Sequence, residues 1–302
     1  MKHPRTDLAV EAFDGASDGF PGVRVNHWDA ADVRMTEVVI KDPHTAVQLG
    51  KPCGVYLTME CPLLREQDPD ARIAISTLLG EELARMIPQD EKSPVLVIGL
   101  GNRFITPDSL GPLTVDRTLV TRHMLSAGFA PEDMRSVCAV SPGVLGVTGV
   151  ETMEMVLGLV DKVKPRAVIC IDSLAARDTS RIGCTVQLAD TGIQPGAGVG
   201  NRRSPLTKET LGVDVIAVGM PTVVYAATLA RDAFAALTDS NTDGDALASI
   251  ERELLGKDVG EMIVTPREID ALVKNAAVMI SSGLNRALHP QLSPAEIAAM
   301  MD

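Results

Sequence analysis

Hydrophobic and polar residues alternate along this chain in two patterns, which predict buried strands and helices that cover them. Unbroken apolar runs are typical of strands buried on both faces, and apolar residues three or four positions apart are typical of helices. Strands of this kind are predicted at 95–98, 137–140, 167–171, 184–188 and 213–219. Helices are predicted at 68–87, 150–163, 222–237 and 266–288, with one more beginning after Asp108. This alternation predicts an α/β fold with a central, mostly parallel sheet and helices on both faces.

The first ninety residues have a different pattern. Short β-like runs at 23–25, 36–40 and 54–59 lie among turn signals such as Asp42-Pro43 and Lys51-Pro52. We therefore expect residues 8–90 to form a β-rich extension with one helix. It would pack on an α/β core at 91–302 within a single compact domain.

Composition narrows the choice of partners and compartment. The 302 residues are 45% hydrophobic and carry a net charge of −12, which argues against binding nucleic acid or an anionic membrane through a basic face. The chain starts without the apolar run of a signal peptide, and no stretch approaches the ~20 apolar residues of a membrane span. Five scattered cysteines without zinc-ligand spacing predict buried free thiols. We expect a cytoplasmic protein.

The stretch at 95–112, VLVIGLGNRFITPDSLGP, combines a buried strand, a tight turn and a helix start. Gly99 and Gly101 open a dinucleotide-binding fingerprint, but Phe104 stands where the third glycine is required, so a nucleotide site is disfavoured. Asp108 follows this strand, and Asp172 directly follows the apolar run at 168–171. Neighbouring parallel strands would bring both carboxylates to the sheet edge at which open α/β sheets bind ligands.

Two interpretations of this pair remain open on spacing alone. Two close carboxyl groups share a proton and can act as acid and base on a water molecule. Alternatively, each aspartate caps a following helix, Asp108 before Ser109 and Asp172 before Ser173. No histidine lies between 124 and 288, and His123 falls late in the helix after Asp108, so we expect no bound metal and no cofactor.

A glycine-rich stretch at 192–201, GIQPGAGVGN, forms a second candidate feature. Gly196, Gly198 and Asn201 could let a substrate backbone approach closely. The alternative is a mobile surface loop. A P-loop is excluded because the stretch lacks the Lys-Ser/Thr ending.

Seven segments of the sequence resemble the spore germination protease family, and they run from near the first residue to near the last. The segments are RTDLAVEA at 5–12, VIGLGNRFITPDSLGP at 97–112, PGVLGVTGVET at 142–152, IDSLAAR at 171–177, DTGIQPGAGVGN at 190–201, VGMPTVV at 218–224 and GLNRALH at 283–289. The family is distantly similar to hydrogenase maturation endopeptidases, which implies a similar α/β core with acidic residues at its edge. The resemblance implies an endopeptidase that degrades small acid-soluble spore proteins during germination, in the spore core, as a homotetramer. It also implies that Asp108 and Asp172 are the two essential aspartates of an atypical aspartic-type mechanism.

The resemblance gives the N-terminal segment a role as well. Family members are zymogens that remove a short prosegment after an acidic residue followed by an apolar residue and alanine. Asp7-Leu8-Ala9 fits this pattern, so we expect residues 1–7 to be a prosegment cut between Asp7 and Leu8. An ordinary disordered terminus is the alternative. Two other functions also stay open: a metal-dependent maturation peptidase that trims a partner protein, and a non-catalytic binder of spore proteins.

Overall fold

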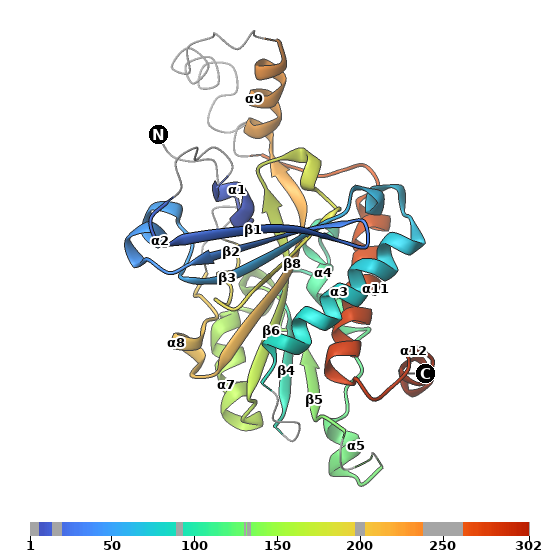
Figure 1. Ribbon diagram of the computed structural model, residues 1–302. Coiled ribbons are helices and arrows are strands. Elements are labelled where there is room, and N and C mark those ends of the chain that lie inside the picture. The colour runs from blue at the N-terminus through green and yellow to red at the C-terminus, as the bar shows by residue number, and fades with distance from the viewer. Residues whose placement is uncertain are drawn as a thin grey trace.

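The computed structural model describes residues 6–13, 20–88, 93–129, 131, 134–196, 203–237 and 262–301 (Figure 1). Its strands are β1 (Val23–Ala30), β2 (Val33–Ile40), β3 (Gly54–Glu60), β4 (Val95–Gly99), β5 (Val137–Val140), β6 (Ala167–Ala176), β7 (Thr185–Ala189), β8 (Asp214–Tyr225) and β9 (Ile263–Val264). Its helices are α1 (Ala9–Phe13), α2 (Pro43–Leu49), α3 (Pro69–Met86), α4 (Leu110–Val115), α5 (Arg122–Ser126), α6 (Leu145–Thr148), α7 (Thr152–Val163), α8 (Lys208–Leu211), α9 (Ala226–Leu237), α11 (Ile269–Leu288) and α12 (Pro294–Met301). Three 3-10 turns are η1 (Pro62–Glu66), η2 (Thr106–Asp108) and η3 (Thr179–Arg181).

All nine described strands belong to one mixed sheet. Its order is β1-β2-β3-β7-β8-β6-β4-β5, and β9 pairs with β8. The half from β8 to β5 is parallel, and the half from β1 to β8 is antiparallel. The predicted α/β class is therefore confirmed. The strands of the predicted N-terminal extension continue the same sheet, because β3 pairs with β7.

Helices cover both faces of the parallel half, which explains its unbroken apolar strands. Val95 and Val97 of β4 belong to a core cluster with α3 and α11, whereas Leu96 and Ile98 belong to another with α7 and α8. Alternate residues of a strand point to opposite faces, so a strand covered on both sides has no polar face. None of the helices within the described ranges is long and apolar enough to cross a membrane.

Helix α3 begins where its sequence predicts, and one side of the helix is buried. Asp68 caps it by accepting the backbone N–H of Ala71 at 2.8 Å. The buried residues are Ala71, Ile75, Leu79, Gly80 and Leu83, which lie on one side of the helix. Ile73, another apolar residue of this helix, is 62% exposed. The helix is apolar on more than one side, so hydrophobicity alone did not fix its orientation.

Two strands run further than their apolar runs predict. β6 continues beyond Ile171 to Ala176, and β8 continues beyond Gly219 to Tyr225, because the two strands pair with each other along this extension. Helix α9 accordingly begins at Ala226, four residues after the start of the helix predicted at 222–237.

The prediction of buried thiols is correct for Cys61, Cys170 and Cys184 but wrong for Cys53, which is exposed.

The single helix predicted after Asp108 is in fact two short helices, α4 and α5. Asn285 of α11 holds the chain between them: its Oδ1 accepts the Leu119 N–H, and its Nδ2 donates to the Arg117 carbonyl, both at 2.9 Å. These bonds use backbone groups that a continuous helix would pair internally. Helix α12 was not predicted at all.

Helices α3 and α11 pack against each other at Gly80 and Gly283. A substitution at one of these glycines tests this packing directly. A Cβ added at Gly283 would lie 2.8 Å from the Ser76 carbonyl oxygen, whereas one added at Gly158 of α7 would have nothing within 4 Å. We expect Gly283→Ala to lower the free energy of unfolding by about 1–3 kcal/mol. Gly158→Ala, the matched control, should raise it by up to ~1 kcal/mol. Urea unfolding measures both, and equal effects would contradict the observed helix crossing.

Candidate active site

Asp108 is placed by the turn that follows β4. Its backbone N–H donates to the Ile105 carbonyl at 2.8 Å, and the Thr222 hydroxyl of β8 donates to the Pro107 carbonyl at 2.8 Å. The carboxylate turns back into the loop, where Oδ2 accepts the Asn102 N–H at 2.8 Å. The turn is thus fixed at both ends, and the carboxyl group has a defined position at the sheet edge.

Gly101 is required by this turn. Its φ of +105° lies in a region that favours glycine, and an added Cβ would lie 2.0 Å from the Asp108 carbonyl oxygen. Gly101 therefore lets the chain pass close to Asp108, and Gly99 lies against Gly111 of α4, whose carbonyl oxygen would be 2.3 Å from an added Cβ. This accounts for the pair of glycines without a nucleotide site.

Asp172 lies inside β6, five residues from its start, and only 7% of it is exposed. In register, Asp172 pairs with Gly219 of β8, and Gly219 pairs with Gln187 of β7. Its Oδ1 accepts the Ser173 N–H at 2.9 Å. No helix begins at Ser173, and the Asp108 carboxylate bonds backwards to Asn102, so the helix-cap interpretation is wrong for both aspartates.

Both carboxyl groups line one cavity of about 450 Å³, together with Gly101, Ser173, Thr222 and Asp7. Burial raises the pKa of Asp108 to about 6, against the opposing effect of the Asn102 N–H. Burial, and then the charges of Asp108 and Asp7, raise the pKa of Asp172 well above its usual range. The arrangement favours one protonated and one ionised carboxyl group near neutral pH.

The predicted cleavage point lies in the same place. The Asp7 N–H donates to the Ala175 carbonyl at 2.9 Å, and the Ala175 N–H donates to Asp7 Oδ2 at 2.8 Å, so the segment docks beside β6. Leu8 is fully buried in a cluster with Leu174 and Ile182. A second cavity, about 350 Å³, is lined by Asp7, Asp172 and side chains of β7 and β8.

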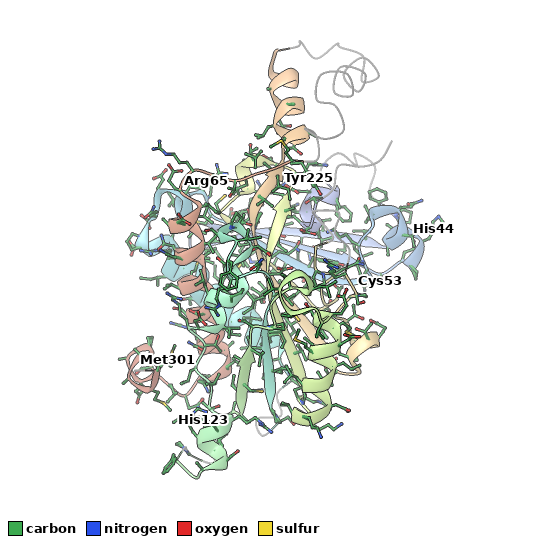
Figure 2. All side chains as sticks on the ribbon, turned by 180° about the vertical axis from the view of Figure 1, so that it is seen from behind. His44, Cys53, Arg65, His123, Tyr225 and Met301 are labelled. Carbon is green, nitrogen blue, oxygen red and sulfur yellow. The ribbon has the colours of Figure 1, made fainter. Side chains whose placement is uncertain are left out.

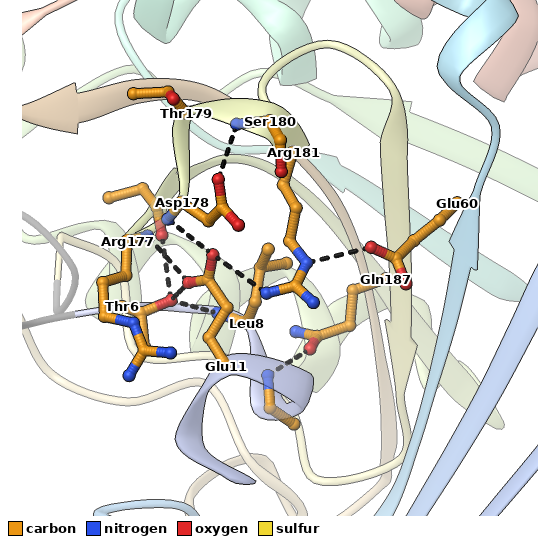
Figure 3. Close-up of polar contacts among 12 residues, drawn as sticks. Thr6, Leu8, Glu11, Glu60, Arg177, Asp178, Thr179, Ser180, Arg181 and Gln187 are labelled. Carbon is orange, nitrogen blue, oxygen red and sulfur yellow. Dashed lines mark hydrogen bonds and ion pairs between the residues drawn. The ribbon is translucent and has the colours of Figure 1, made fainter. Parts of the chain in front are cut away.

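Glu11 anchors this docked segment (Figure 3). Although acidic, it is fully buried, and its carboxylate accepts the backbone N–H groups of Arg177 at 2.7 Å and Asp178 at 2.8 Å. It also accepts the Thr6 hydroxyl and lies 3.5 Å from the guanidinium of Arg181. Residues 6–13 are thus held against β6 and η3 by a buried carboxylate as well as by apolar contacts.

The glycine-rich stretch is only partly described. Gly196 lines both cavities, which places this end of the loop at the site. Arg203 follows the stretch and lies 3.6 Å from Glu151, just before α7. Gly198 and Asn201 lie outside the described residues, so their predicted contact with substrate stays a prediction.

Three polar residues at the site were not selected from the sequence: Glu11, Lys51 and Gln187. The sequence marks Lys51 only as part of a turn signal and Gln187 only as part of a strand. The available signal was the amide side chain of Gln187 within the predicted strand at 184–188, in which Thr185 is the only other polar residue. Glu11 offered no signal, because an acidic residue near a terminus is usually exposed.

His123 lies far from the two aspartates, as predicted. It belongs to α5, and Thr121 beside that helix bonds to Val137, the first residue of β5, at the opposite end of the sheet from Asp108. Figure 2 shows His123 at one end of the molecule and Tyr225, the last residue of β8, near the other. Across the described ranges, no group of three or more His, Cys, Asp or Glu side chains is arranged to hold a metal ion.

Fold and site together define an α/β protein in which a buried and a partly buried carboxyl group share a cavity with the chain's own N-terminal segment. The family model described as "Germination protease" matches residues 6–240. The chain belongs to the germination protease family, a family of peptidases, which confirms the resemblance seen in its motifs.

Relatives in this family match over almost the whole chain. The germination protease of Caldanaerobacter subterraneus subsp. tengcongensis is 42% identical over 98% of this chain and 98% of its own. That of Clostridium tetani is 38% identical over 99% of both, and that of Bacillus mycoides is 36% identical over 95% of this chain and 94% of its own. The crystal structure of a NiFe hydrogenase maturation protease, HycI from Thermococcus kodakarensis KOD1, covers 65% of this chain and 94% of its own at 19% identity, with a TM-score of 0.32.

Proposed function

We propose that this protease removes its own first seven residues by cutting between Asp7 and Leu8, and then hydrolyses small acid-soluble spore proteins during germination. The observation that carries the proposal is the shared cavity: Asp7, Asp108 and Asp172 all line it. Because Asp7 lines this cavity together with both carboxyl groups, we infer that the Asp7–Leu8 bond is cut there. The germination protease family supports the substrate class.

The mechanism we propose is acid–base hydrolysis by the two aspartates. Asp108, the more accessible, is ionised and takes a proton from the attacking water. Asp172, the more deeply buried, holds the proton and gives it to the leaving amine. Because interacting carboxyl groups titrate as a pair, this division describes the dominant protonation state rather than two independent sites. The reaction as proposed needs no cofactor and no metal.

Spore proteins would follow the path of residues 6–13 along β6, so that segment must leave before a substrate enters. We further propose that the enzyme works in the spore core as a homotetramer and binds neither DNA nor membrane directly. The net charge of −12 supports the last point. Light scattering of the purified protein measures the assembly, and a mass other than four chains would contradict the tetramer.

One experiment tests the central proposal. The wild type, Asp108→Asn and Asp172→Asn are expressed, and N-terminal mass and digestion of a purified spore protein are followed with and without a chelator. The wild type should lose residues 1–7 and digest the spore protein in both conditions, and both variants should do neither. Activity that disappears with chelator and returns with nickel or zinc would instead favour a metal-dependent maturation peptidase. Spore-protein binding unaffected by either substitution, without any cleavage by the wild type, would favour a non-catalytic binder.

A further inference from the structure

Two side chains from distant parts of the chain hold the carbonyl oxygen of Asp7. Lys51, between α2 and β3, donates from Nζ at 2.7 Å, and Gln187 of β7 donates from Nε2 at 3.2 Å. This oxygen belongs to the Asp7–Leu8 peptide bond. The two donors therefore contact the group on which negative charge develops when that bond is hydrolysed.

Gln187 also binds the segment on the C-terminal side of this bond. Its Oε1 accepts the Ala9 N–H at 2.7 Å, and its Nε2 donates to the Asp7 carbonyl, so the same amide contacts the chain on both sides of the Asp7–Leu8 bond. The bond to Ala9 fixes the orientation of the amide, because only the oxygen can accept and the NH₂ group must then face Asp7. Lys51 is fixed in a similar way, since Nζ also donates to the Thr6 carbonyl at 3.0 Å.

One of the two donors, Gln187, lies across from Asp172 on the sheet. Gln187, Gly219 and Asp172 form one row over β7, β8 and β6, and their side-chain positions share a face. With strands spaced ~4.8 Å apart, Gln187 and Asp172 are separated by about 10 Å. The row's middle residue has no side chain, and the cavity of about 350 Å³ over it is lined by Asp7, Lys51, Gln187 and Asp172. The Asp7 carbonyl oxygen is thus held by both donors, and Asp7 lines the cavity that Asp172 also lines.

We propose that Lys51 and Gln187 form the oxyanion-binding site of this enzyme, for its own Asp7–Leu8 bond and for the corresponding bond of a protein substrate. This inference rests on the proposed function. Water adds to the Asp7 carbonyl carbon and gives one proton to the ionised aspartate, while the carbonyl π electrons move to the oxygen held by Lys51 and Gln187. The C–N bond then breaks, the oxygen becomes a carbonyl again, and the protonated aspartate supplies the proton to the Leu8 nitrogen. One water is consumed, and the products are the Asp7 acid and the Leu8 amine.

The chemistry of the two donors suits this role. An ammonium group binds an anionic oxygen more strongly than a neutral carbonyl, so its contact gains strength as the reaction proceeds. The 3.2 Å contact of Gln187 can shorten in the same step. Burial lowers the pKa of Lys51, and the carboxylates of Asp7 and Glu11 act in the opposite direction. Because Lys51 polarises the carbonyl, the protonated aspartate is needed only to donate its proton to the leaving amine.

The test must separate stabilisation of the oxyanion from simple tethering of the segment. The self-processing rate of the full chain is measured by mass spectrometry for Lys51→Met, Lys51→Arg and Gln187→Glu, which keeps the acceptor for Ala9. Docking of residues 6–13 is measured by amide hydrogen exchange in an Asp172→Asn background, where the chain should stay uncut. Lys41→Met, at an exposed lysine, is the matched control.

We expect Lys51→Met to lower the rate 10²–10³-fold, with a much smaller loss of exchange protection at Ala9–Glu11. Lys51→Arg should recover part of the rate, Gln187→Glu should lose at least tenfold, and Lys41→Met should match the wild type. A Lys51→Met rate within threefold of the wild type would overturn the inference. So would a rate loss fully matched by lost protection, because that is the result of a tether. Continued processing by Asp172→Asn alone would instead overturn the proposed function, so failure of this inference and failure of the proposed function are distinguishable. Amide protection in the core reports whether each variant folds.

Discussion

Asp108→Asn is expected to lower the rate of self-processing by 10²–10⁴-fold and, at the same time, to stabilise the protein at neutral pH. The loss of rate follows from removing the group that accepts the water proton. The gain in stability follows from the native environment, which disfavours the charged carboxylate. A purely structural role for Asp108 predicts the opposite sign for the change in stability.

The pH dependence of this gain can be worked out. Because the pKa of Asp108 is raised to about 6 from 3.8, the native state keeps a proton that the unfolded chain releases between these pH values. The wild type therefore loses stability as pH rises from about 4 to about 6, by up to about 3 kcal/mol in total. The asparagine variant lacks this titration. Its advantage should be fully present above about pH 6 and absent near pH 4.

Urea unfolding of both proteins at pH 4, 5, 6 and 7.5 measures the difference. Asp108→Asn retains an oxygen that can accept the Asn102 N–H, so the turn after β4 is preserved. Asp172→Asn should change stability in the same direction, because burial raises the pKa of Asp172 as well. A difference that stays constant over this pH range would contradict a raised native pKa, whatever the effect on activity.

The sequence alone was sufficient for the parts of this site that depend on local pattern. An apolar run closed by glycines placed Asp108 in the loop after a strand, and a second run placed Asp172 at the end of a neighbouring strand. β4 does end at Gly99, which pairs with Ile171, one residue before Asp172. The geometry of parallel strands was therefore enough to predict from the sequence that the two carboxyl groups lie close together.

Contacts across long stretches of sequence could not be found in this way. Gln187 lies 180 residues from Asp7 in the chain, and their contact exists because β7 pairs antiparallel with both β3 and β8. Apolar runs do not specify the order of strands in a sheet, so nothing local marked Gln187 as a neighbour of Asp172. The extension of β6 past Ile171 was missed for a related reason, since it depends on pairing with β8. That extension provides Ala175, to which the N-terminal segment docks.

Glu11→Ala is expected to release residues 6–13 from the site and to slow self-processing by roughly 100-fold. In the native state the Glu11 carboxylate accepts two backbone N–H groups, and Arg181, which bonds to it, also donates to Glu60 at 2.9 Å (Figure 3). Removing one partner of such a buried set costs about 3 kcal/mol or more, which is a factor of about 100 in the docking equilibrium. The segment can avoid this cost by undocking, since its N–H partners then become free to bind water.

This substitution should affect docking and rate together, in contrast to Lys51→Met. In the Asp172→Asn background, exchange protection at Ala9–Glu11 should fall by the same factor as the rate of self-processing in the otherwise wild-type chain. Glu11→Gln, which keeps one acceptor oxygen, should lie between, and Glu81→Ala, at an exposed position of α3, should leave both unchanged. If Glu11→Ala kept its protection and still processed slowly, the carboxylate would act on the reaction itself rather than on docking. Proportional losses would instead support a role for Glu11 in holding the Asp7–Leu8 bond at the site. In that case a protein substrate must displace this segment before it can be cut.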